Sequence, residues 1–369
     1  HHPFTVETRV RFPYGLQKKK GMIDKSKLVC ITPFKYTEVF DKEQFLCCPG
    51  WLKEDIYQST NIKDNFNSPK AQKIRQSILD GTYKYCDENQ CPHLSALKQS
   101  KFIDKRFVPK TKEVLNELKL ISEIETVNFC FDRSCNLKCP SCRLDFINYL
   151  GKDRVEVDNK LAQVNNELSD NIKRLYLSGS ADPFYSKSFR QFLIEFDSSK
   201  YPKMKGIHLH TNGLLWTPKL WEKMKNIHKF VKSCEISIDA STKNTYENIT
   251  RLGGNWETLL ERLQYIVTIP TIKEYTFSFV VQDTNYTEMY GFYKIISNLT
   301  QDTGKKVTIF FNHITNWGTY TEKEYIEKDV SNPEHNEHSD FLKELEKIHG
   351  KSNVTHNFNQ LLESKIKII

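Results

Sequence analysis

From about residue 124 onward, short runs of β-branched and aromatic residues alternate with longer segments of helical period, and this alternation constrains the fold most. The runs that predict strands are ETVNFCF, KRLYLSG, KGIHLHT, KSCEISI, YTFSFVV and KVTIFFNHI. Several helical segments between them open on expected cap residues, namely Asp158, Ser186, Thr217 and Asn255. The pattern predicts an α/β fold with a parallel sheet, either an open doubly wound sheet or a partial (β/α)6 TIM-like barrel.

Polar and glycine residues follow the predicted strands at their carboxyl ends. A loop with three cysteines follows the first strand, SGSADP the second and TNG the third, while SIDA closes the fourth. In parallel α/β architectures, the carboxyl ends of the strands form the face where loops converge on a ligand. We therefore expect the functional site at this face.

Cysteine usage favours metal or redox chemistry over disulfides, because ten cysteines occur in a chain with no recognisable secretory signal. No apolar run approaches the ~18 residues of a membrane span, and we expect a cytoplasmic protein. Cys135, Cys139 and Cys142 fall within one short loop. A structural zinc ion there would need a fourth ligand, such as His208 or His210. A 4Fe–4S cluster on three thiolates would instead leave one iron open to a small molecule.

The spacing Cys135-x3-Cys139-x2-Cys142, placed after the first predicted strand, resembles the signature of the radical S-adenosylmethionine superfamily. The resemblance implies a 4Fe–4S cluster on these thiolates, with S-adenosylmethionine bound at its open iron. It further implies reductive cleavage to a 5′-deoxyadenosyl radical, which abstracts hydrogen from a substrate C–H bond.

Later segments match the same superfamily in order. LSGSADPF at 177–184 resembles the family's glycine-rich segment, with Asp182 where Glu is usual. HTNG at 210–213, SIDAST at 237–242 and YENITRLGGNW are similar to the segments that follow. The resemblance implies that Ser237 and Arg251 contact the ribose or carboxylate of S-adenosylmethionine, whereas the alternative for Arg251 is a surface ion pair. The implied cofactor-binding residues are Ser178, Gly179, Asp182, Thr211, Asn212, Ser237, Asp239 and Arg251.

The early cysteines resemble the auxiliary-cluster domain called SPASM, or its shortened twitch form, although here this segment precedes the radical domain. The resemblance implies a second 4Fe–4S cluster, with ligands Cys30, Cys47, Cys86 and Cys91. Cys48 competes with Cys47 for one position, and we favour Cys47. A zinc ion on four thiolates is the alternative. Cys130 and Cys234 are expected to be buried inert thiols, or else hydrogen donors to a substrate radical.

These motifs predict five parts of the chain: a tag or linker at 1–21, a SPASM/twitch-like module at 22–100, a linker helix at 101–122, a radical domain at 123–320 and a helical extension at 321–369. The first part holds five basic residues against one Glu, which is half of the formal net charge of +8. The remainder is only mildly basic, and we do not expect a nucleic-acid partner.

The leading hypothesis is a radical enzyme that modifies a ribosomally made peptide, by crosslinking, oxidation or epimerisation. Its expected partners are a peptide or small-molecule substrate and a low-potential reductant, such as flavodoxin or ferredoxin. The alternatives are radical modification of a carbohydrate or other small metabolite, and a non-enzymatic iron–sulfur or zinc protein. An RNA-modifying enzyme is disfavoured by the modest charge.

Overall fold

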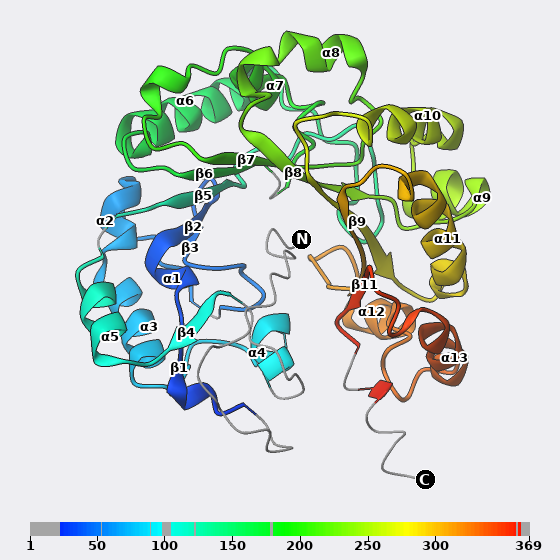
Figure 1. The fold of residues 1–369 in the computed structure, drawn as a ribbon, viewed down its shortest axis with the longest axis horizontal. Coiled ribbons are helices and arrows are strands. Elements are labelled where there is room, and N and C mark those ends of the chain that lie inside the picture. The colour runs from blue at the N-terminus through cyan, green and yellow to red at the C-terminus, as the bar shows by residue number, and fades with distance from the viewer. Residues whose placement is uncertain are drawn as a thin grey trace. The chain divides into compact units, whose positions relative to one another are not determined.

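The computed structural model describes residues 23–52, 54–88, 90–97, 105–121, 123–177, 180–358 and 361–362. The tag or linker predicted at 1–21 lies outside the described residues. The chain divides into two compact units, whose elements carry the labels of Figure 1. The first unit comprises residues up to Asp132, Glu156–Gly179 and Ser198–Lys205, and the second comprises Arg133–Val155, Ser180–Asp197 and Gly206–Ile369.

The first unit contains two groups of paired strands. In one, β2 (Tyr36–Val39) lies between β3 (Gln44–Phe45), which is antiparallel to it, and β5 (Thr126–Phe129), which is parallel. Strand β6 (Arg174–Leu177) continues the parallel pairing beside β5. In the other, β1 (Leu28–Cys30) pairs antiparallel with β4 (Phe107–Pro109).

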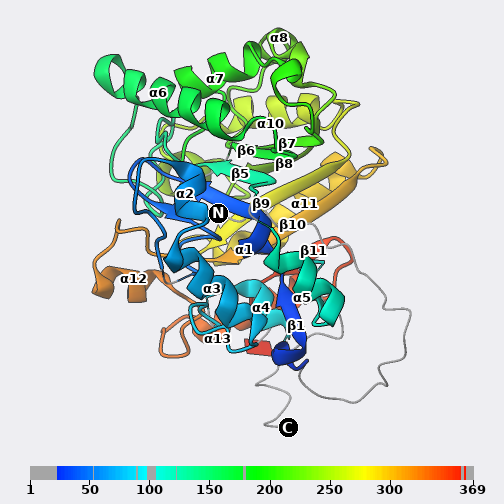
Figure 2. The same cartoon turned by 90° about the vertical axis from the view of Figure 1, so that its left-hand side faces the viewer.

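Short helices connect these strands, and α3 packs against both α1 and β1 (Figure 2). The helices α1 to α6 are Thr32–Lys35, Ile62–Phe66, Pro69–Leu79, Pro92–Leu97, Lys112–Lys119 and Gly151–Leu168, the last of which begins in the second unit. Helix α3 ends shortly before Gly81, whose φ of +89° suits glycine.

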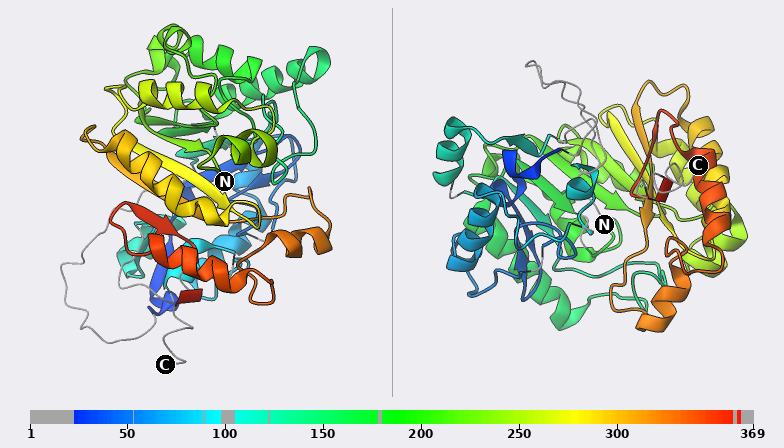
Figure 3. Two further views of the ribbon diagram at one scale, coloured as in Figure 1. Left: turned by 90° about the vertical axis from the view of Figure 1, so that its right-hand side faces the viewer. Right: turned by 90° about the horizontal axis from the view of Figure 1, so that it is seen from below.

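The second unit pairs five strands in parallel, and they lie side by side in sequence order from β7 to β11. These strands are Gly206–Thr211, Val231–Ser237, Glu274–Val281, Lys306–His313 and Val354–His356. Helices α7 to α13 are Lys187–Ile194, Pro218–Lys223, Lys243–Thr245, Trp256–Ile266, Met289–Thr300, Glu322–Lys328 and His338–Ile348. Helix α11 packs against α13, as Figure 3 shows.

The structure confirms all six predicted strands, as β5 to β10, and the parallel α/β class. The arrangement of the six as one partial barrel stays a prediction. Three of the predicted caps are also confirmed, because Ser186, Thr217 and Asn255 each accept a backbone N–H of the first helical turn. The cap predicted at Asp158 is wrong, because α6 already begins at Gly151.

Strands β2 and β3, which extend the sheet of the first unit, were not predicted. In the part of the chain that the structure describes, no helix is long and apolar enough to cross a membrane.

Candidate active site

The second unit folds the loop that carries Cys135, Cys139 and Cys142. Backbone pairing holds it at both ends, because Cys135 pairs with Ile147 and Lys138 pairs with Leu252. Gly253 is required beside the second pair, since its φ is +89° and a Cβ there would lie 2.8 Å from the ring of Phe146. The loop is therefore fixed by the segment that follows it and by Leu252, which lies far along the sequence.

The sulfur of Cys135 accepts hydrogen bonds from two N–H groups. The backbone of Leu137 donates to its sulfur at 3.4 Å, and the side-chain amide of Asn212 donates at 3.7 Å. The same amide donates to Asn136 Oδ1 at 2.9 Å, which fixes its orientation. The sequence-predicted residue Asn212 thus lies directly against the cysteine loop.

Each of the other two thiols faces a guanidinium group. Arg251 Nη1 donates to Cys139 Sγ at 3.5 Å, and Arg143 Nη2 donates to Cys142 Sγ at 3.4 Å. Arg143 also donates to the backbone oxygen of Ser180 at 2.7 Å. Arg143 was not predicted from the sequence, although an arginine directly after the third cysteine was a visible signal.

These surroundings fit an anionic iron–sulfur group. Burial raises the pKa of Cys135 to about 12 and also raises the pKa of Cys139, while Arg143 and Arg251 respectively oppose these shifts. Cluster ligation requires deprotonated thiolates, and N–H donors to their sulfur atoms orient and tune the site. The loop offers three sulfur atoms, an N–H donor to each and two cations, which is a suitable donor set for a cluster of net negative charge.

Asp182 is buried, and both oxygens of its carboxylate accept hydrogen bonds from residues of the second unit. Its Oδ1 accepts from the backbone of Phe184 at 3.0 Å and of Tyr185 at 3.1 Å. Its Oδ2 accepts from Thr211 Oγ1 at 2.7 Å and from the backbone of Asn212 at 2.9 Å. Burial raises the pKa of Asp182, whereas these donors oppose the shift. The residue therefore joins its own loop to the end of β7.

Arg251 and Asp239 form a buried ion pair, with 2.6 Å between Nη2 and Oδ2. The alternative interpretation of Arg251, a surface ion pair, is wrong, because the residue is only 8% exposed. Burial alone would lower the pKa of Arg251, but Asp239 and Cys139 raise it overall. Arg251 therefore links Cys139 to the end of β8 as a permanent cation.

Asp239 has a backbone conformation that non-glycine residues seldom adopt, with φ of +60°. Its Oδ1 accepts from Val280 N–H at 2.8 Å, and its backbone oxygen accepts from the amide of Asn285 at 2.9 Å. These bonds hold the strained residue in place, so that its carboxylate points at Arg251.

Ser237, at the end of β8, lies among buried polar groups. Its Oγ is 2.6 Å from His210 Nε2 and 3.0 Å from Ser278 Oγ. The other predicted cofactor residues, Ser178 and Gly179, lie outside the described residues. Of the predicted cofactor set, the structure therefore gathers Asp182, Thr211, Asn212, Ser237, Asp239 and Arg251 in the second unit.

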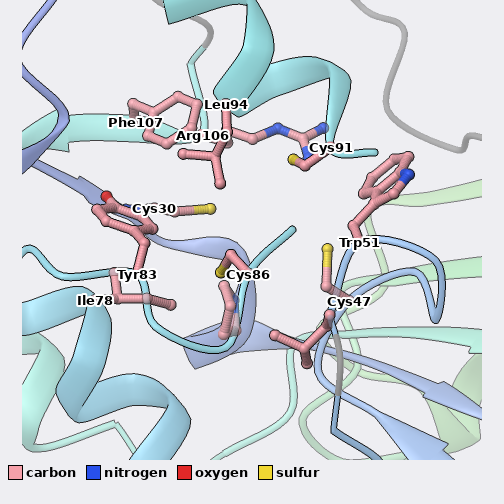
Figure 4. A pocket seen from close by; sticks show the side chains of 12 residues that line it. Cys30, Cys47, Trp51, Ile78, Tyr83, Cys86, Cys91, Leu94, Arg106 and Phe107 are labelled. Carbon is pink, nitrogen blue, oxygen red and sulfur yellow. The ribbon is translucent and has the colours of Figure 1, made fainter. Parts of the chain in front are cut away.

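A second set of cysteines lines one cavity within the first unit: Cys30, Cys47, Cys86 and Cys91. Figure 4 shows their sulfur atoms turned toward the same space. Apolar side chains fill most of the remaining wall, among them Trp51, Leu94 and Phe107, and the guanidinium of Arg106 lies at one side.

Local structure explains how these four thiols meet. Cys30 ends β1, and Cys47 lies two residues after β3. Cys86 pairs through its backbone with Leu52, and Cys91 directly precedes α4. Four separate segments thus deliver one thiol each.

The cavity disfavours the negative charge of a thiolate unless a bound ligand offsets that charge. Burial raises the pKa of Cys91 to about 11 and that of Cys47 well above its usual range. Arg106 opposes both shifts, and the backbone of Leu94 also donates to Cys91. Four thiols, one guanidinium and an otherwise apolar wall fit an iron–sulfur cluster. The protein would ligate every iron of such a cluster, so that no iron would be open to substrate.

Cys48 is buried but is not among the residues that line this cavity. Burial, followed by the nearby Glu38, raises its pKa to about 12. Glu38 also contacts Cys130, with 3.8 Å between Sγ and Oε2, and accepts from the hydroxyl of Tyr36 at 2.7 Å. Cys130 and Cys234 are buried, as expected.

All ten cysteines are free thiols. Among the described residues, no group of three or more His, Cys, Asp or Glu side chains is arranged to hold a single metal ion.

Comparison with known proteins identifies part of the chain. Residues 129–281 match the model of the radical SAM superfamily. No curated protein matches the chain. The matched range contains Cys135, Cys139, Cys142, Asp182, Asn212, Asp239 and Arg251.

Several solved structures are similar at low identity. Native anSMEcpe with bound AdoMet is 17% identical, with a TM-score of 0.38, and the alignment covers 59% of this chain and 61% of that one. A histidine-tagged form of anSMEcpe with bound AdoMet is also 17% identical, with a TM-score of 0.37 and coverage of 52% and 51%. TYW1 with a lysine–pyruvate adduct bound is 13% identical, with a TM-score of 0.33 and coverage of 61% and 71%. The chain thus spans about half to three fifths of the length of anSMEcpe.

The match over residues 129–281 confirms the sequence-based prediction that the chain is an enzyme.

Proposed function

We propose that this enzyme binds a 4Fe–4S cluster at Cys135, Cys139 and Cys142, where S-adenosylmethionine is cleaved reductively to a radical that abstracts hydrogen from a substrate C–H bond. The observation that carries the proposal is the set of N–H donors to all three thiols, in a loop that the superfamily model matches. Arg143 and Arg251 would hold the sulfur atoms in place and offset their negative charge.

The residues around this loop would orient the cofactor. We assign this role to the set predicted from the sequence: Ser178, Gly179, Asp182, Thr211, Asn212, Ser237, Asp239 and Arg251. Within it, Asp182 acts as a positioning residue, because four donors of this chain already use its carboxylate. Asp239 likewise acts through Arg251, whose guanidinium retains N–H groups beyond its three contacts.

We further propose a second, auxiliary 4Fe–4S cluster in the cavity of Cys30, Cys47, Cys86 and Cys91, within a SPASM/twitch-like module at 22–100. The shared cavity supports this assignment, and the position of Cys48 outside its wall supports Cys47 as the ligand. The remaining proposed parts are the linker helix at 101–122, the radical domain at 123–320 and the extension at 321–369. A cluster with four thiolates suits electron transfer or structural support.

The proposed substrate is a ribosomally made peptide, with a carbohydrate or other small metabolite as the second candidate. The reaction consumes an electron, so a low-potential reductant such as flavodoxin or ferredoxin is the proposed partner. We propose a cytoplasmic location, which the ten free thiols support.

The test combines iron analysis with product detection in anaerobically reconstituted protein. With S-adenosylmethionine and dithionite, we expect 5′-deoxyadenosine from the unaltered enzyme and none from Cys139→Ala. We expect the Cys135, Cys139 and Cys142 triple Ala variant to retain about half of the iron. Cys47→Ala should also lose about half, whereas the matched control Cys48→Ala should lose none. Equal iron in the unaltered and triple-Ala proteins would refute the assignment of the loop.

A further inference from the structure

The parallel strands β7, β8 and β9 carry a polar face, opposite the face that packs on α10. Ile236 lies on the α10 side, because its Cγ2 and Leu259 Cδ1 both lie within 3.5 Å of the point where a Cβ on Gly213 would be. Since successive residues of a strand alternate in direction, Glu235 and Ser237 face the other way. Figure 1 shows α10 on the outer side of β8. The polar face comprises His208, His210, Glu235, Ser237, Thr276 and Ser278.

Glu235 lies in the middle of this face and is 2% exposed. Its register neighbours are His210 on β7 and Thr276 on β9. Its Oε1 is 3.8 Å from His210 Nε2, and Ser278 hydrogen-bonds to the carboxyl group. Its Oε2 has no hydrogen-bond partner among the described residues.

Glu235 differs from the other buried carboxylates of the second unit. Asp239 has Arg251 at 2.6 Å, and Asp182 has four donors. Among the described residues, Glu235 has no lysine or arginine partner. His210 does not supply the missing cation, because burial lowers its pKa well below the usual range. Burial without a lysine or arginine partner is unfavourable for a carboxylate, and burial raises the pKa of Glu235 to about 7.

We propose that the polar face of β7 to β9 is a subsite for a protonated primary amine of the substrate, with Glu235 as its counter-ion. The inference rests on the proposed function, because Ser237, two residues along the same strand, belongs to the proposed cofactor set. Glu235 Oε2 would accept one ammonium N–H, and hydroxyl or imidazole groups such as Ser278 and His210 would accept the others. The ligand would thereby supply the hydrogen bond that Glu235 Oε2 lacks among the described residues.

Two kinds of substrate present this chemistry, namely a lysine side chain in a peptide and an amino sugar. The probes are Nα-acetyl-lysine methylamide and glucosamine. Each has a counterpart without the cation: the same lysine derivative acetylated on Nε, and glucose. Binding of one amine probe but not the other identifies the source of the amine.

The experiment measures dissociation constants by calorimetry at pH 8, in reconstituted protein with S-adenosylmethionine present. We expect at least one amine probe to bind, its neutral counterpart to bind at least tenfold more weakly, and Glu235→Gln to weaken the amine probe at least tenfold. Glu235→Asp, which keeps the charge, should recover part of the affinity. Iron content and circular dichroism establish that each variant is folded and loaded.

Equal affinity of both amine probes for the unaltered enzyme and Glu235→Gln, including no binding to either protein, would overturn the inference. A parallel loss of S-adenosylmethionine affinity in Glu235→Gln would also overturn it, because the carboxylate would then serve the cofactor. Failure of the proposed function has a separate signature, which is absence of 5′-deoxyadenosine from the unaltered enzyme with a full iron complement.

Discussion

Replacing Arg251 by Met is predicted to destabilise the second unit strongly. The substitution removes the guanidinium that lies 2.6 Å from Asp239 Oδ2 and that also donates to Ile238 O and Cys139 Sγ. Both partners of the ion pair are buried, so that Asp239 would remain as an uncompensated charge in the interior. Breaking a buried pair in this way costs about 3–5 kcal/mol, far more than loss of an exposed pair.

The assay is urea unfolding of the cluster-free, reduced protein at pH 7 and pH 5. In Arg251→Met, the pKa of Asp239 should rise further, because burial is no longer opposed by the guanidinium. The native state would then bind a proton that the unfolded state releases, so the penalty should shrink as the pH falls from 7 to 5. Asp239→Asn and the double variant complete a double-mutant cycle, for which we expect a coupling of about 2–3 kcal/mol. A coupling below about 0.5 kcal/mol, or a penalty independent of pH, would refute this reasoning.

Three further predictions concern the same unit. Asp182→Asn should cost about 2–4 kcal/mol in urea unfolding, because an amide cannot accept from all four donors, and a cost below about 0.5 kcal/mol would contradict the described bonding. Gly253→Ala should lower the free energy of unfolding by about 1–2 kcal/mol more than Gly318→Ala. Both residues have φ above +80°, but only at Gly253 would the added Cβ meet a side chain, that of Phe146. Equal losses would show that Phe146 moves aside. Glu235→Gln should gain stability relative to the unaltered protein by up to about 3 kcal/mol between pH 5 and pH 8. Burial raises the pKa of Glu235 from 4.5 to about 7, so that its ionisation destabilises the native state as the pH rises, and parallel pH profiles of stability would contradict this.

The fold was predictable where its pattern is local. Strands such as Glu274–Val281 are rich in β-branched and aromatic residues, and several helices between them begin at cap residues. Strand β2 was missed because it lies outside the alternation of strands and helices and pairs with β5, which lies far along the chain. Such pairing depends on tertiary packing and leaves no periodic signal. The start of α6 was misplaced because Asp158 resembles a cap, although the helix already begins at Gly151.

The site was predictable in its residue types but not in its bonding. The cysteine spacing indicated Cys139, and the family resemblance indicated Arg251 and Asp239. It could not indicate that Arg251 donates to Cys139, because that contact joins residues 112 positions apart. Glu235 was also missed, although an acidic residue between Cys234 and Ile236 in a buried strand was a detectable signal of an inward-facing carboxylate.

The two sets of cysteines belong to different units, and this separation bears on how the enzyme would acquire its iron. Cys30, Cys47, Cys86 and Cys91 lie in the first unit, whereas the loop of Cys135, Cys139 and Cys142 lies in the second. The described contacts that shape each set come from its own unit: the pairing of Leu52 with Cys86 in one, and the donation from Arg251 to Cys139 in the other. A bound cluster would stabilise the unit that holds its ligands, because the folded site would bind metal more tightly than the unfolded chain. Loss of one set should therefore leave the iron content of the other unchanged, and the losses in iron should add when both sets are replaced.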